Sequence, residues 1–143
     1  MNSITVFGKR RVRAKWKEAS RLADRILILL RESSAALEVY FLSSREITAI
    51  NSRFFRRKRR VSGEKVDVLA FPHPHGFPNP SHTKGKTLGE IYINQDCVRR
   101  KKETLARLLI HGILHLLGHD HQGHKDALNM EALEEEVFKK AFP

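Results

Sequence analysis

The residues best suited to chemistry lie in one stretch, 111–121, in which four of the eleven residues are histidine. His111 and His115 are four residues apart, so on an α-helix they share one face, with Cβ atoms roughly 5–6 Å apart. Two imidazoles at that separation can bind one metal ion, because each Zn–N bond is about 2.0–2.1 Å long. Gly118 can adopt a positive φ and end the helix, and the turn would bring His121 to a third ligand position. Three neutral nitrogens leave zinc one position for water, which indicates a catalytic rather than a structural site.

The spacing His-x3-His-x2-Gly-x2-His is that of the metzincin zinc peptidases, with one departure. A metzincin has glutamate directly after its first histidine as the general base, whereas this chain has Gly112, which cannot transfer a proton. The pattern therefore predicts a zinc hydrolase without the usual peptidase base. Asp120 is a candidate for orienting a ligand imidazole through a hydrogen bond, with helix capping as the alternative. His119 either takes part in the site or is a solvated loop residue.

The charge of the chain indicates its partner. A net charge of +11 is large for 143 residues and predicts a polyanion, with nucleic acid the first candidate. Six of the eight residues 53–60 are basic, and residues 99–102 are all basic. This clustering argues against a basic surface that serves only solubility. Phe54 and Phe55 lie inside the first cluster, where they could stack on a base or pack in the core.

The elements that position these residues are predicted to form one domain spanning residues 1–143. Strands are predicted at 4–7, 37–42, 66–71 and 88–94 from their β-branched and aromatic residues. Apolar spacing predicts helices at 15–31, after a cap at Ser43 or Ser44, at 97–117 and at 124–141. The helix at 97–117 carries both spaced histidines and is expected to be the central buried helix.

Smaller features complete the expectations. Asp67, inside a predicted strand, is expected to have a structural role, and the loop 72–87 could line a substrate groove. Met130 is expected in the core, with a place beneath the metal as the alternative. There is no signal-peptide segment, and the longest apolar run, 26–30, is too short for a membrane span. These features, with a single cysteine, predict a cytoplasmic protein without membrane contact.

Residues 111–121 match throughout the pattern His-Gly-x-Leu-His-Leu-x-Gly-x-Asp-His, the hallmark of the YbeY family of bacterial endoribonucleases. Residues 66–72 resemble that family's Thr-Asp-Val-Leu-Ser-Phe-Pro strand, and residues 88–91 resemble its Leu-Gly-Asp-Ile. Residues 130–134 are similar to its C-terminal helix, so the resemblance covers nearly the whole chain.

The chain departs from the family pattern at three of these positions. Val66 and Ala70 replace a threonine and a serine, which removes two hydroxyls near the expected groove, and Glu90 replaces an aspartate. These changes concern the strength or specificity of the expected activity and leave the zinc ligands intact.

The resemblance implies an α+β, zincin-like fold: a four-stranded, mostly parallel mixed sheet packed with helices around a central metal-binding helix. It implies one Zn²⁺ per chain on His111, His115 and His121. The implied activity is that of a zinc-dependent single-strand endoribonuclease in 16S rRNA 3′-end maturation and ribosome quality control. The implied partners are single-stranded ribosomal RNA and the small ribosomal subunit or its proteins.

In the expected reaction, hydrolysis of an RNA phosphodiester, zinc would lower the pKa of a bound water and polarise a phosphoryl oxygen, and an arginine would stabilise the charge that develops on the phosphate. The family places that arginine soon after the asparagine that Asn51 matches, but the segment is several residues longer here. Arg56 is therefore the nearest candidate for the catalytic arginine, with Arg57 next, and Arg57, Arg59 and Arg60 are expected to bind substrate. Two alternatives stay open: a zinc peptidase, and a non-catalytic ribosome-assembly factor in which zinc only stabilises the histidine-rich turn.

Overall fold

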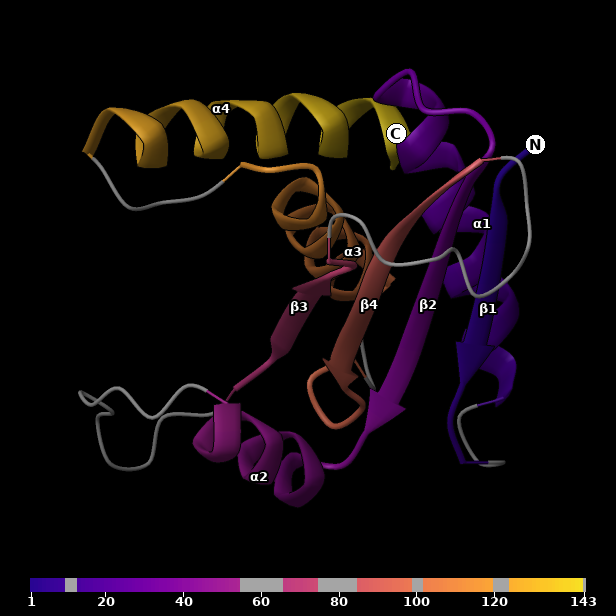
Figure 1. The fold of residues 1–143 in the computed structure, drawn as a ribbon, viewed down its shortest axis with the longest axis vertical. Coiled ribbons are helices and arrows are strands. Elements are labelled where there is room, and N and C mark those ends of the chain that lie inside the picture. Colours follow the sequence, from indigo (N-terminus) through magenta and orange to yellow (C-terminus); the bar gives the residue numbers. More distant parts are fainter. Residues whose placement is uncertain (10–12, 55–65, 75–84, 99–101, 120–123, 143) are drawn as a thin grey trace.

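The computed structural model describes residues 1–9, 13–54, 66–74, 85–98, 102–119 and 124–142. In chain order the elements are β1 (Ser3–Phe7), α1 (Arg13–Leu29), β2 (Ala35–Leu42), α2 (Ser44–Phe54), β3 (Val68–Pro72), β4 (Lys86–Asn94), α3 (Lys102–Leu116) and α4 (His124–Ala141). The strands form one sheet in the order β1-β2-β4-β3 (Figure 1). β1, β2 and β4 run parallel, and β3 pairs antiparallel with β4 at an edge. The α+β class and the mostly parallel four-stranded sheet are confirmed.

One face of the sheet is covered by helices α1 and α3 (Figure 1). Helix α4, which runs across the top of Figure 1, packs against both of these helices. The burial pattern of β2 agrees with coverage of one face, because alternate residues of this strand are buried and the residues between them are only partly buried. Leu109, Ile110, Ile113 and Leu114 of α3 are each at most 1% exposed. The prediction of a central buried helix is thus confirmed, and Met130 of α4, 1% exposed, lies in the same core.

Most boundaries differ from the predicted ones by one or two residues, and the start of α3 differs by five. The predicted helix at 97–117 is shorter, because α3 begins at Lys102, and Asn94–Val98 form a turn that the amide of Cys97 closes on the carbonyl of Asn94. The third strand extends to Pro72, which is tolerated because β3 is an edge strand. Asp67 lies just before β3 with an exposed side chain, and its main-chain oxygen accepts a hydrogen bond from Asn94.

Helix α2 begins with a reciprocal cap, as the two serines predicted. The amide of Glu46 donates to Ser43 Oγ at 3.1 Å, and the amide of Ser43 donates to Glu46 Oε1 at 2.9 Å. The backbone hydrogen bond from Ser43 is the largest cause that holds the pKa of Glu46 below its usual value. The carboxylate therefore stabilises the fold above its unfolded-state pKa, and that contribution is lost as the pH falls through the lower folded-state pKa.

Replacing Glu46 by alanine is expected to lower the free energy of unfolding by about 0.5–1 kcal/mol at neutral pH, because one end of the reciprocal cap is lost. The difference from the parent chain should shrink at acid pH, where the parent carboxyl is itself protonated. Urea unfolding at the two pH values measures it. The control is Glu131→Ala at an exposed position of α4, and an equal, pH-independent loss in both variants would contradict the role of the cap.

Candidate metal centre

Helix α3 brings the two spaced histidines into direct contact. Nε2 of His111 and Nε2 of His115 lie 3.1 Å apart, and the two rings meet edge to face with centroids separated by 4.6 Å. Two nitrogens that bind one tetrahedral zinc ion at about 2.0–2.1 Å lie roughly 3.3–3.4 Å apart, so the pair has nearly the separation that a shared ion requires. The His111 side chain is 29% exposed, which leaves the pair accessible from solvent.

Helix α3 ends just before Gly118, the glycine that was predicted to end it. Gly118 has φ +100°, its amide donates to the carbonyl of His115, and the amide of His119 donates to the carbonyl of Leu114. These two bonds form a Schellman motif, so the predicted helix stop is confirmed. His119 is exposed beyond it.

The predicted third ligand, His121, and the predicted orienting residue, Asp120, both lie outside the described residues. Within the described ranges no three donor side chains form a complete ligand set. The structure therefore brings two of the three predicted ligand residues together, and the zinc site itself stays a prediction.

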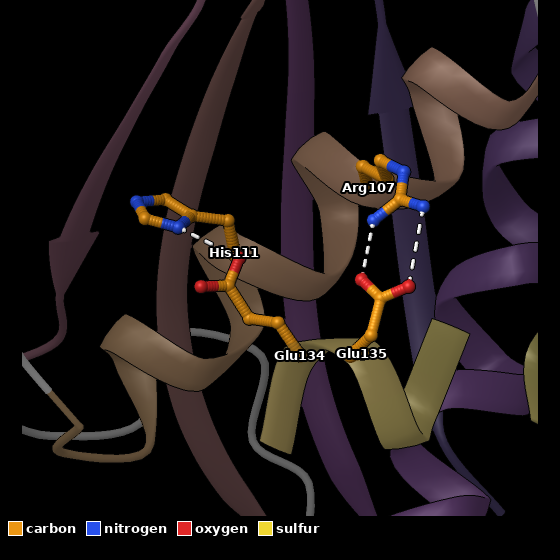
Figure 2. Close-up of polar contacts among 4 residues, drawn as sticks. All are labelled: Arg107, His111, Glu134 and Glu135. Carbon is orange, nitrogen blue, oxygen red and sulfur yellow. Dashed lines mark hydrogen bonds and ion pairs between the residues drawn. The ribbon is translucent and has the colours of Figure 1, made fainter. Parts of the chain in front are cut away.

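Sequence analysis missed one neighbour of this pair. Oε2 of Glu134, on α4, lies 3.1 Å from Nδ1 of His111 (Figure 2). The other ring nitrogen of His111, Nε2, faces His115. A signal was present in the sequence, because 130, 134, 137 and 141 follow helical spacing. Met130, Val137 and Ala141 are buried core residues, so a glutamate in that series requires a polar partner.

The position that carries the metzincin base faces the protein core. Gly112 is buried on α3, and a Cβ atom built on it would lie 2.9 Å from Cδ1 and 3.0 Å from Cγ2 of Ile91 on β4. Any longer side chain would have to enter the packed layer between α3 and the sheet. Glycine thus allows the helix to approach β4 closely, and a side chain at this position would start in contact with Ile91.

Most of the other predicted site residues lie outside the part of the chain that the structure describes. Arg56, Arg57, Arg59 and Arg60 lie outside the described residues, as do Phe55 and most of the loop 72–87. Phe54 is 62% exposed and meets Phe71 of β3 edge to face, with ring centroids 5.6 Å apart. It is therefore not a core residue, and it stands at the start of the basic segment.

A pocket of about 600 Å³ lies on the sheet face that points away from α1 and α3, and Phe54, Phe71 and His73 contribute to its lining. Glu38 and Glu90 lie in register on neighbouring strands there. The hydroxyl of Tyr40 donates to Glu38 at 2.8 Å, and that of Tyr92 donates to Glu90 at 3.0 Å. Burial, followed by the bond to Glu90, raises the pKa of Tyr92 to about 12. Two carboxylates make this pocket unfavourable for phosphate.

Comparison with known proteins agrees with this geometry. The chain matches the family described as Endoribonuclease YbeY over residues 6–141. It is 36% identical over 122 residues to an Endoribonuclease YbeY of Myxococcus xanthus, a match that covers 78% of this chain and 38% of that protein. It is 31% identical to an Endoribonuclease YbeY of Aquifex aeolicus, with 96% of both chains covered. A solution structure of a Thermotoga maritima protein aligns with a TM-score of 0.59 at 22% identity, covering 97% of this chain and 89% of that one.

The family match spans nearly the whole chain, and the relatives that it resembles are proteins named as endoribonucleases. The chain belongs to the YbeY family. The solved structure supports the fold alone, and the chain spans well under half of the Myxococcus protein. In the described part of the chain, no helix is both long and apolar enough to cross a membrane.

Proposed function

We propose that this protein is a metal-dependent endoribonuclease that uses zinc to cleave single-stranded RNA. The observation that carries the proposal is the pair of Nε2 atoms, 3.1 Å apart at the exposed end of α3, in a chain of the YbeY family. His111, His115 and His121 would hold the ion. When bound, zinc supplies a Lewis acid for a phosphoryl oxygen and a water of lowered pKa.

The chain's own residues would position the RNA. Phe54 lies inside the basic cluster 53–60, and Arg56 of that cluster is proposed to contact the scissile phosphate, with Arg57, Arg59 and Arg60 binding neighbouring phosphates. The exposed ring of Phe54 offers a surface for one base.

The cellular role follows as part of the same proposal. A net charge of +11 suits a ribosomal RNA substrate. We propose action on 16S rRNA at its 3′ end and in ribosome quality control, in the cytoplasm and in contact with the small ribosomal subunit. A zinc peptidase is disfavoured, because the base position is Gly112, packed against Ile91.

Metal removal tests the activity. Untagged full-length protein is expected to contain one zinc per chain and to cut single-stranded ribosomal RNA. Dialysis against a chelator should abolish cleavage, and added zinc should restore it. The measurements are elemental analysis and gel separation of the RNA fragments, with a double-stranded RNA as the control substrate. Stoichiometric zinc with no cleavage at any salt concentration would reject the nuclease in favour of an assembly factor, and absence of zinc would reject the metal centre.

A further inference from the structure

We infer that Glu134 is a positioning residue for the metal centre, and that it fixes His111 in the tautomer that can bind the ion. The inference rests on the proposed zinc site and names a residue outside the predicted ligand set. It begins with the contact between Glu134 Oε2 and His111 Nδ1, at 3.1 Å.

A carboxylate next to a neutral imidazole determines which ring nitrogen carries the proton. Glu134 can only accept a hydrogen bond when ionised, so the Nδ1 that faces it is the protonated nitrogen. The lone pair of His111 then lies on Nε2, the atom that faces Nε2 of His115. The same contact therefore selects the tautomer and directs the unprotonated nitrogen toward Nε2 of His115.

Helix α4 holds the carboxylate in place. Met130 and Val137, one turn before and one turn after Glu134, are 1% and 4% exposed in the core shared with α3. The Glu134 side chain is 23% exposed, so it lies at the margin of this packed face, and its position depends on the docking of α4. The packing of α4 on α3 therefore affects the orientation of His111 through the hydrogen bond to Glu134.

The neighbouring residue supplies a matched comparison. Glu135 joins the same two helices through Arg107, with Nη1 and Oε2 2.9 Å apart, but does not touch a histidine (Figure 2). Its side chain is 51% exposed. Replacing Glu135 removes a link between α3 and α4, whereas replacing Glu134 also removes the partner of His111.

The experiment measures zinc affinity by competition with a chromophoric chelator, using untagged full-length chains. Glu134→Ala is expected to bind zinc about 10- to 100-fold more weakly than the parent chain. Glu134→Gln should lie between the two, because its amide oxygen can still accept the bond from Nδ1. Glu135→Ala should retain the parent affinity within about twofold, since no metal ligand loses a partner.

A second readout needs no metal. In the metal-free parent chain, nitrogen chemical shifts of His111 should report the Nδ1–H tautomer, and Glu134→Ala should shift the ring toward Nε2–H. Unchanged affinity in Glu134→Ala, or equal losses in Glu134→Ala and Glu135→Ala, would overturn the inference. A parent chain that binds no zinc would instead reject the proposed function. If Glu134→Ala does not fold, Glu134→Gln tests the same point. A Glu134→Gln chain with the same zinc affinity and the same His111 tautomer ratio as Glu135→Ala would contradict the role of the Glu134 carboxylate.

Discussion

Replacing His115 by alanine is expected to lower the zinc affinity of the chain more than about hundredfold, because loss of a ligand should exceed the 10- to 100-fold cost of losing a ligand's partner. The removed Nε2 is one of the two that converge, and the remaining donors would hold the ion with one bond fewer. RNA cleavage should fall below detection while the chain stays folded, since His115 is only partly buried near the last turn of α3. Chelator competition, elemental analysis and a cleavage assay measure the three quantities.

The control for this variant is His73→Ala. His73 lines the pocket on the opposite sheet face, so its loss removes an imidazole without touching the converging pair. It is expected to leave the zinc content near the parent value. If His115→Ala still bound one zinc per chain with parent affinity, the metal centre would have to lie elsewhere in the chain.

Much of the fold could be predicted because its signals are local. The β-branched and aromatic residues of β2 and the helical spacing in α1 and α4 identified elements that the structure contains, and Gly118 ends α3 through the predicted positive φ. The predicted start of α3 was wrong because Asn94–Val98 form a turn. A side-chain hydrogen bond from Asn94 to Ser44, a residue 50 positions earlier in the sequence, helps to hold this turn. Such long-range bonds leave no periodic pattern.

In the candidate site, too, contacts within one helix could be predicted from the sequence, whereas contacts between elements could not. The contact of His111 with His115 follows from a four-residue spacing within one helix, so the sequence was sufficient to predict it. Glu134 comes from a different helix, and its contact depends on how α4 docks on α3. Gly112 was recognised as a missing base, but its packing role required the position of Ile91 on β4.

The packing of Gly112 leads to the last prediction: Gly112→Glu, which restores the metzincin pattern in sequence, is expected to unfold the chain rather than create a peptidase. The new Cβ would press on Ile91, which is 0% exposed, and the carboxylate would be buried without a partner. We expect a loss above about 4 kcal/mol in the free energy of unfolding, a large part of the 5–15 kcal/mol typical of a domain. Thermal unfolding followed by circular dichroism, and a casein digestion assay, measure the two outcomes.

Two further variants make this prediction decisive. Gly112→Ala should fold but lose about 1 kcal/mol, because an overpacking cost of roughly 1–3 kcal/mol is offset by about 1 kcal/mol of improved helix propensity. Asn129→Glu adds the same charge at an exposed position of α4 and should change stability by less than about 0.5 kcal/mol. A folded Gly112→Glu chain that digests casein would show that the position opens toward the histidine pair and would return the peptidase alternative. Parent-like stability without proteolysis would show instead that the layer between α3 and β4 can adapt, so that glycine is not required there for packing.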